Sequence, residues 1–213
     1  MSIHTEQIYT DLKDQIIRGV FPPAFSLTET DLAQKYGVSR NTIKKSLMML
    51  ESEGLVSIER NKGAKVRVYS IEEVLEFLEV RDVLEGYVAR ITAAAISDTQ
   101  IAEMEGLLEQ MKQLSRDKDL LAYSQCNHQL HQIIYDACPN HTAANMTVLL
   151  KQQMRKYNSK TILIPGRDMA SLREHEKILE AMKAHDGDAA EESMREHIRN
   201  VSNTFRENYM LLF

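Results

Sequence analysis

The sequence predicts a mainly α-helical protein with two domains, in which three helices and a two-stranded β-hairpin precede an all-α bundle of about six helices. Residues 28–69 contain two short helical segments around Gly37, followed by two β-prone segments around Gly63. After this segment the apolar residues recur at helical spacing, and no stretch reads as a convincing strand. A chain of 213 residues can bury two cores, and we expect the domains to span residues 1–70 and 71–213.

The first helix is indicated by apolar residues whose spacing places them on one helical face. These residues are Ile8, Leu12, Ile16 and Ile17. Gly19 suits the position just after a helix, where a left-handed backbone is common, and Pro22 and Pro23 prevent the helix from continuing. The domain therefore opens with a helix and a proline-marked break.

Capping residues predict the next two helices. Thr28 and Asp31 resemble a capping box, and Gly37 ends the short helix that they begin. Ser39 is a good N-cap for the third helix, which Gly54 ends. The apolar residues of this third helix share one face, and they are Ile43, Leu47 and Leu50.

A β-hairpin is predicted after the third helix. Residues 55–59 and 64–69 are β-prone, and Asn61, Lys62 and Gly63 suit the reversal between them. Helix, turn, helix and hairpin in this order predict a winged helix-turn-helix, a fold that binds DNA.

The second domain is predicted to contain about six helices, separated by residues that break helices. The breaks fall at Ser97-Asp98, Pro139-Asn140 and Pro165-Gly166. The expected helices span residues 71–95, 98–116, 119–137, 141–162, 168–186 and 188–210. Their Leu, Ile, Val and Met residues are interpreted as core packing, so the eleven methionines indicate no special site.

Positive charge is concentrated in the first domain, although the whole chain carries −5. Residues 1–69 contain ten Lys/Arg and eight Asp/Glu, whereas the remainder contains sixteen and twenty-three. Between Lys35 and Arg67 the counts are eight and three. A phosphate backbone attracts local positive charge, so this distribution favours nucleic-acid binding by the first domain.

The protein is expected to be cytoplasmic, with no membrane partner. No apolar run approaches the roughly 18 residues that span a bilayer, and the polar N-terminus lacks the apolar region of a signal peptide. Cys126 and Cys138 are too few for a disulfide framework and do not form a close metal-binding pair. We expect both to be reduced core residues.

The third helix is predicted to read DNA, because a recognition helix presents its first turns to the base edges of the major groove. The residues expected to contact DNA from this helix are Ser39, Arg40, Asn41, Thr42, Lys44 and Lys45. Arg40 is the expected base reader, since arginine pairs bidentately with guanine, whereas lysine more often contacts phosphate. Lys35, with Arg60, Lys62 and Gly63 at the wing, is predicted to contact the flanking backbone or the adjacent minor groove. The alternative is a solvated charged face, but cap, turn, helix and wing occur together in order.

Short motifs along this domain carry a family resemblance. In order they are Ile16 with Gly19, Pro23 with Leu27, Leu32-Ala33, Gly37-Val38-Ser39-Arg40, and Leu50 with Glu53-Gly54-Leu55. They match the I-x-x-G, P-G-x-x-L, L-A, G-V-S-R and L-x-x-E-G-L motifs of the GntR family of bacterial transcription regulators, which the stretch from Ile8 to Val68 resembles. Ala24 stands where the family has glycine. Lys44 replaces an arginine that usually touches DNA, and Lys45 replaces a glutamate, so the family's operator sequences do not carry over.

The second domain also resembles a known domain type. Arg81, Leu84 and Glu85 fit an R-x-x-L-E helix, and a closing E-H…G-D…H pattern is matched by Glu174-His175, Asp188 and His197. These motifs resemble the FCD effector domain, which implies the FadR subfamily. The length of this domain resembles the shorter, six-helix, VanR-like branch.

Histidine placement suggests what the second domain binds. His131 and Asn127 lie one turn apart on one helical face, and His175 and His197 lie on two later helices, so three imidazoles could converge. FCD domains with a divalent metal use one aspartate and three histidines. The resemblance places those ligands at Asn127, His131, His175 and His197. Asparagine offers a neutral oxygen instead of a carboxylate, so a zinc or nickel ion would be held less strongly.

A small carboxylate effector is expected to fill the open coordination positions of such an ion. Arg81 has two interpretations. Its guanidinium could clamp an anionic effector, or it could form a salt bridge with Glu85 one turn away. The sequence does not choose between them.

These observations predict a homodimeric transcription regulator, not an enzyme. We expect a repressor that binds a palindromic double-stranded DNA operator and responds to the carboxylate or the metal. One alternative is a regulator with a degenerate effector pocket that acts without metal, which Asn127 keeps open. A metal-dependent hydrolase is the other, but no convincing general base accompanies the histidines and a wing would have no purpose.

Overall fold

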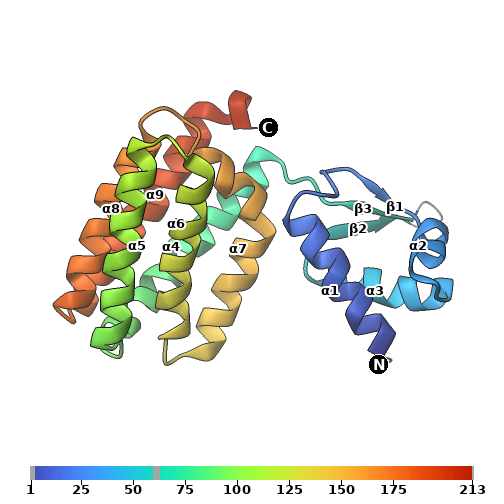
Figure 1. Cartoon of the computed structure of the whole chain (residues 1–213), viewed down its shortest axis with the longest axis horizontal. Coiled ribbons are helices and arrows are strands. Elements are labelled where there is room, and N and C mark those ends of the chain that lie inside the picture. The colour runs from blue at the N-terminus through green and yellow to red at the C-terminus, as the bar shows by residue number, and fades with distance from the viewer. Residues whose placement is uncertain (1–2, 60–62, 213) are drawn as a thin grey trace. The chain divides into compact units, whose positions relative to one another are not determined.

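The computed structural model of the chain describes residues 3–59 and 63–212, and it is mainly helical, as predicted (Figure 1). The chain divides into two units, Met1–Ser70 and Ile71–Phe213, each with its own hydrophobic core. No helix of the described residues is long and apolar enough to cross a membrane.

The first unit is built from three helices and three short strands. In chain order these are α1 (Ile3–Ile17), β1 (Ser26–Leu27), α2 (Glu29–Tyr36), α3 (Arg40–Ser52), β2 (Val56–Glu59) and β3 (Gly63–Val66). The predicted caps are present, because the hydroxyls of Thr28 and Ser39 accept from the backbone N–H of Asp31 and Thr42, each at 3.2 Å. Gly37 ends α2 with φ 64°, a left-handed conformation that glycine adopts without steric cost. The helix-turn-helix therefore follows from local capping.

The predicted two-stranded wing is part of a three-stranded antiparallel sheet with strand order β1-β3-β2. Val56 lies opposite Val66 in the β2–β3 pair, and Ser26 lies opposite Lys65 in the added β1–β3 pair. The sequence did not predict β1, because two residues after a proline pair are too short to show an alternating pattern. Leu27 of this strand is buried and joins the core.

The core of the first unit lies between α1, α3 and the sheet. Leu12 of α1 and Leu50 of α3 are completely buried, and α1 packs along α3. The hydroxyl of Ser46 donates to the carbonyl of Thr5 at 2.8 Å inside this contact. One face of α3 is thus fixed against the core, which leaves the opposite face at the surface.

The second unit contains all six predicted helices, each ending within three residues of its expected limits. They are α4 (Ile71–Ala93), α5 (Asp98–Arg116), α6 (Leu120–Asp136), α7 (His141–Thr161), α8 (Arg167–Lys183) and α9 (Gly187–Leu212). We call this unit the bundle. Its helix starts are locally encoded: Ser97 and Gln100 form a capping box at α5, and the Asn140 side chain caps α7.

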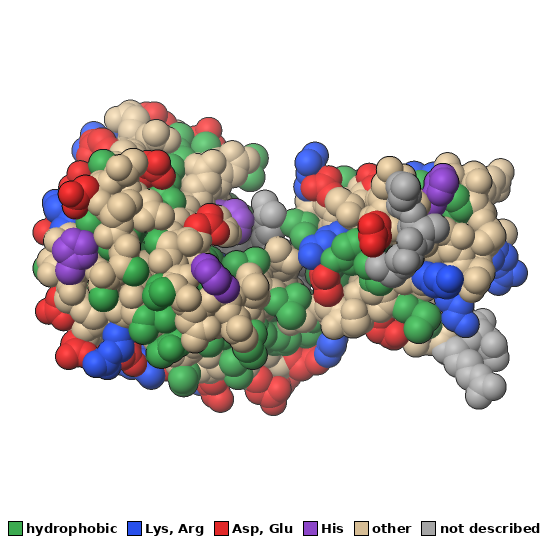
Figure 2. All heavy atoms as spheres, turned by 90° about the horizontal axis from the view of Figure 1, so that it is seen from below, with side chains coloured by type: hydrophobic (Ala, Val, Ile, Leu, Met, Phe, Trp, Pro, Cys, Tyr) green, Lys and Arg blue, Asp and Glu red, His purple; other side chains and the backbone are tan. Residues whose placement is uncertain are grey.

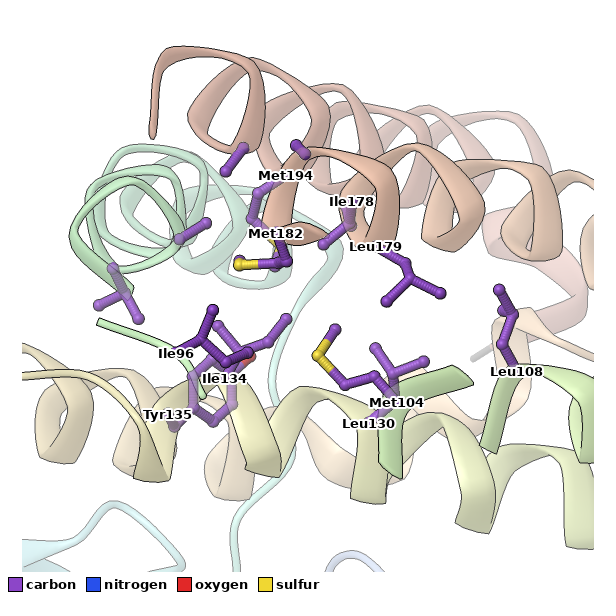
Figure 3. Packing of buried hydrophobic residues seen from close by; sticks show 14 of the residues in the cluster. Ile96, Met104, Leu108, Leu130, Ile134, Tyr135, Ile178, Leu179, Met182 and Met194 are labelled. Carbon is purple, nitrogen blue, oxygen red and sulfur yellow. The ribbon is translucent and has the colours of Figure 1, made fainter. Parts of the chain in front are cut away.

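Interdigitated aliphatic and thioether side chains fill the bundle. Figure 3 shows Met104 of α5, Leu130 of α6, and Ile178 and Met182 of α8 pointing toward one another. All four are completely buried, as the interpretation of the methionines as core residues predicts, whereas Met146, Met169 and Met210 are exposed. This packing holds α6, α8 and α9 at the distances that bring their polar residues together.

Ala24 is a point of backbone strain in the first unit. Its φ is 62°, a left-handed angle that costs an L-residue roughly 1–2 kcal/mol, and it occupies the position where the matching family motif has glycine. The Ala24 N–H donates to the carbonyl of Val66 at 2.9 Å, so the sheet holds this conformation in place. We predict that Ala24→Gly raises the free energy of unfolding by about 0.5 to 1 kcal/mol, because relief of strain exceeds the added flexibility of the unfolded chain. Urea denaturation measures this, and Ala33→Gly inside α2 is the control that should instead be destabilising. An unchanged or lower value for Ala24→Gly would contradict the strain.

Candidate functional site

The residues predicted to read DNA from α3 lie on its solvent-facing side. The side chains of Arg40, Asn41, Lys44 and Lys45 are exposed along its first two turns. Thr42 is half-buried, and its hydroxyl lies 2.9 Å from that of Ser39, so these two residues mainly shape the start of the helix. The exposed set contains three cations and one amide, which are groups that pair with phosphates and base edges.

Arg40 is held only loosely by its own domain. Its Nη2 lies 3.3 Å from Oε2 of Glu29, and the Arg40 side chain is 68% exposed. An exposed ion pair of this kind is worth roughly 0–1 kcal/mol, so it does not prevent the guanidinium from turning to another partner.

The other predicted contacts divide into three cases. Lys35 is exposed but engaged, since its Nζ donates to Gln15 at 3.2 Å and lies 5.5 Å from the ring centre of Phe21. Gly63 begins β3 with φ 84°. Arg60 and Lys62 lie outside the described residues.

Three buried histidines from three helices meet inside the bundle. We call His131 of α6, His175 of α8 and His197 of α9 the histidine cluster. One possible ligand atom from each lies within 4.8 Å of the other two, and the Nε2 atoms of His131 and His175 are 3.1 Å apart. The ring centres are 4.6 to 5.2 Å apart. The convergence expected from the sequence is present.

Hydrogen bonds at Nδ1 orient two of these rings. Nδ1 of His175 lies 2.6 Å from the carbonyl oxygen of Ser171, one turn earlier on α8. Nδ1 of His197 lies 2.7 Å from Oε2 of Glu174. Because a carbonyl and an ionised carboxylate only accept, both Nδ1 atoms must carry the proton, which leaves each Nε2 with a free lone pair.

The third ring is oriented through a tyrosine. Tyr135 donates its hydroxyl proton to Glu85 at 2.6 Å and accepts from Lys151 Nζ at 2.8 Å. Nδ1 of His131, 3.3 Å from the same oxygen, can therefore only donate to it. His131 thus also presents an unprotonated Nε2 to the cluster.

The chemistry of the cluster is compatible with holding a cation. Burial lowers the pKa of His131 well below its usual value and that of His175 to about 3, and burial also lowers the pKa of His197 against the opposing effect of Glu174. Three neutral imidazoles with converging lone pairs are the donor set that zinc or nickel accepts. Tetrahedral zinc separates its nitrogen ligands by about 3.3 Å, a spacing within the reach of this cluster.

Asn127 is the fourth residue that the resemblance implied as a ligand. It lies one turn before His131 on α6, and its Oδ1 is buried without a hydrogen-bond partner among the described residues. A buried amide oxygen without a partner is costly, and a cation would satisfy it. All four residues that the resemblance implied are therefore compatible with holding a metal.

Glu174 fixes the orientation of His197 in the histidine cluster. Arg167 binds its carboxylate bidentately at 2.9 and 2.7 Å, and Asn200 donates to it at 2.9 Å. Burial alone would raise the pKa of Glu174, but the hydrogen bond from His197 and the charge of Arg167 lower it to about 2. The carboxylate is fixed and ionised, so it orients His197 in the way that carboxylates orient metal-binding histidines.

Arg81 forms the salt bridge that was one of its two interpretations. Its Nε lies 2.6 Å from Oε1 of Glu85, and both side chains are buried. Sequence reasoning missed Tyr135, Lys151 and the role of Glu174. Tyr135 was detectable, since it lies four residues after His131 and so on the same helical face. Lys151 carried no signal, because it occurs in an ordinary polar stretch of α7.

Comparisons with known proteins cover nearly the whole chain. Residues 4–66 match the family described as "Bacterial regulatory proteins, gntR family", and residues 76–200 match the "FCD domain". The HTH-type transcriptional repressor RspR of Escherichia coli (strain K12) is 25% identical over 202 residues, covering 95% of this chain and 89% of that protein. The galactonate operon transcriptional repressor of the same strain is 24% identical over 224 residues, covering 95% of this chain and 97% of that protein. These relatives are regulators, not enzymes.

Solved structures share the fold over both units. A putative transcriptional regulator GntR from Rhodococcus sp. RHA1 superposes with a TM-score of 0.78 at 21% identity, covering 98% of this chain and all of that one. Escherichia coli McbR/YncC gives a TM-score of 0.77 at 21% identity, covering 97% and 99%. At these identities the likeness is one of fold alone.

The metal-free protein should lose stability as the pH falls below about 6.5. The folded rings have lowered pKa values, so the unfolded chain binds protons that the folded protein does not. The contribution of these rings to the free energy of unfolding is complete above the pKa of histidine in the unfolded chain. It is lost as the pH falls toward the pKa values of the folded protein, by up to about 1.4 kcal/mol per pH unit for each ring. Urea titrations of chelator-treated protein at pH 7, 6 and 5 measure this loss.

Two variants identify which residue causes the pH dependence of the free energy of unfolding. His175→Gln removes one buried imidazole and should flatten the pH dependence, whereas His141→Gln, at an exposed position on α7, should keep it. If the free energy of unfolding of the wild-type protein stays constant from pH 7 to pH 5, the rings are not held neutral.

Proposed function

This chain belongs to the GntR family of bacterial transcriptional regulators and carries an FCD domain, and we propose that it is a repressor whose bundle binds a divalent metal and a small carboxylate. The observation that carries the second part is the histidine cluster with its three free Nε2 atoms. Binding of the effector would change the affinity of the first unit for its operator. The protein would act in the cytoplasm, where bacterial operators lie.

The exposed face of α3 supports the proposed operator contacts. Arg40, Asn41, Lys44 and Lys45 would face the major groove, with Arg40 reading a guanine and the lysines contacting phosphates or base acceptors. Figure 2 shows Lys and Arg side chains at the surface of this smaller unit. Ser39 and Thr42 would position the start of the helix, and Lys35 would contact the flanking backbone after leaving Gln15.

In the proposed effector site, His131, His175 and His197 would hold the metal through Nε2, with the Asn127 oxygen as a neutral fourth ligand. The bound ion would supply a positive charge with open positions that a carboxylate can fill. Glu174 and Tyr135 would keep the rings in the binding orientation. Arg81 would contact the carboxylate only by sharing or leaving Glu85.

An exposed apolar stripe supports a homodimer formed through the bundle. Val80, Val83 and Tyr87 lie on one face of α4, at 53%, 57% and 42% exposure. Met146 and Leu149 are exposed on α7, which packs against α4. Figure 2 shows hydrophobic side chains gathered along one side of this larger unit. A twofold dimer would present two copies of α3, which suits a palindromic operator.

A second candidate function is a regulator whose effector site no longer holds metal. Asn127 favours it, because an amide lowers the negative charge of the site. Operator binding would then depend on other signals.

Arg40→Ala should weaken binding to the preferred operator by about 1 to 3 kcal/mol and relax the preference at one base pair. The reason is the loss of bidentate pairing to a guanine, which a phosphate contact cannot replace. Fluorescence anisotropy with an operator selected from random DNA, and with its single-base variants, measures both effects.

Arg18→Ala is the matched control, since Arg18 is an exposed arginine paired with Asp14 next to α1. It should leave the base preference unchanged. Equal losses of affinity across every operator variant for Arg40→Ala would show that Arg40 contacts phosphate instead of a base.

Asn127→Asp should tighten zinc binding by at least about tenfold, because a carboxylate adds a negative charge where the amide offers a neutral oxygen. The same change should destabilise the metal-free protein, because the Asn127 side-chain oxygen is buried without a hydrogen-bond donor and a carboxylate there would lack one too. Competition with a chromogenic chelator measures the affinity, and thermal denaturation with and without zinc measures the stability.

Asn145→Asp on the exposed side of α7 controls for the added charge and should change neither quantity. If the wild type binds no zinc and Asn127→Asp does, the second candidate function is favoured. If neither binds, the histidine cluster is not a metal site.

A further inference from the structure

Lys151 is a cation placed beside the histidine cluster without a carboxylate of its own. It lies half-buried on α7, and its Nζ donates to the Tyr135 hydroxyl at 2.8 Å. Nζ also lies 4.9 Å from the centre of the Tyr135 ring. Since the same hydroxyl contacts Nδ1 of His131, a single oxygen atom separates the ammonium group from the cluster.

The charges around this lysine do not balance. Arg167 is paired with Glu174, and Arg81 is paired with Glu85. Among the described residues no carboxylate oxygen lies within 4.0 Å of Lys151 Nζ, and its nearest acidic neighbour through Tyr135 is the Glu85 already bound to Arg81. One positive charge is therefore in excess here, before any metal is added.

Asn127 does not offset this excess. A carboxylate at that position would have offset one charge of a bound divalent ion, and the amide offsets none. A bound metal and Lys151 would together require an anion with more than one negative charge. A monocarboxylate supplies only one.

We propose that Lys151 binds a second carboxylate of the effector, so that the effector is a small dicarboxylate instead of a monocarboxylate. This inference rests on the proposed function, in which the first carboxylate lies at the histidine cluster. The ammonium has three N–H donors, and the Tyr135 oxygen accepts only one of them, so two remain for an incoming carboxylate.

The lowered pKa of Lys151 also supports its proposed role in binding a carboxylate. Burial lowers the pKa of Lys151 to about 7, and the charge of Arg81 acts in the same direction against the attraction of Glu85. A carboxylate that arrives beside it would stabilise the ammonium form and form a charge-assisted hydrogen bond.

Lactate and malate test the proposal, because malate is lactate with one added carboxylate. Calorimetric titration of the full chain carrying one zinc ion should give malate an affinity at least about tenfold higher, since a hydrogen bond between charged groups is worth that ratio or more. Equal affinities in the wild-type protein would overturn the inference and leave the proposed function standing. If neither acid binds, the carboxylate part of the proposed function fails, and the inference fails with it.

Variants then assign the preference to one side chain. Lys151→Gln should reduce the malate preference to within about twofold of lactate while lactate affinity stays the same, and Lys151→Arg should retain most of the preference. Lys112→Gln removes an equivalent charge from the surface of α5 and should change nothing. A Lys151→Gln protein that keeps the wild-type preference would overturn the inference. Circular dichroism and zinc affinity report whether the Lys151→Gln protein is folded. If it does not fold, the ratio of malate to lactate affinity in the wild-type protein decides whether the effector is a dicarboxylate.

Discussion

The hydrogen bonds at three Nδ1 atoms are the constraint on which the chemistry of the bundle depends. A backbone carbonyl, a carboxylate and a tyrosine hydroxyl each accept one N–H, and together they fix the three rings with Nε2 facing inward. Neutral rings with converging lone pairs repel one another unless a cation lies between them. The packing of α6, α8 and α9 brings the rings together, so the same helix contacts form the hydrophobic core and position the site.

Two residues leave this site short of negative charge. Asn127 brings a neutral oxygen where a carboxylate is expected, and Lys151 brings a cation without a matching acid. Each alone would weaken the binding of a cation, since one removes an attraction and the other adds a repulsion. Together they suit a site completed by its ligand, in which a multivalent anion supplies the charge that the protein omits. This links the choice of effector to two side chains on α6 and α7.

The sequence predicted what local physics determines. Caps at Thr28, Ser39 and Ser97 and helical spacing predicted the mainly helical fold and the limits of the helices, because these signals act within a few residues. The strand β1 was missed because its pairing with β3 is a tertiary contact. The approach of the three histidines came from the resemblance, while Lys151 required the packing of α7 against its neighbours. The roles of the site and DNA-contact residues remain predictions.

Nitrogen-15 NMR of the histidine side chains tests whether the three rings of the histidine cluster present free Nε2 atoms to a metal. Long-range correlation spectra of the metal-free protein at pH 7 distinguish a protonated ring nitrogen from one that carries a lone pair. We expect His131, His175 and His197 all to have a protonated Nδ1 and a free Nε2, and one equivalent of zinc to shift all three Nε2 signals. A proton on the Nε2 of any of these rings, with no change on addition of zinc, would contradict it.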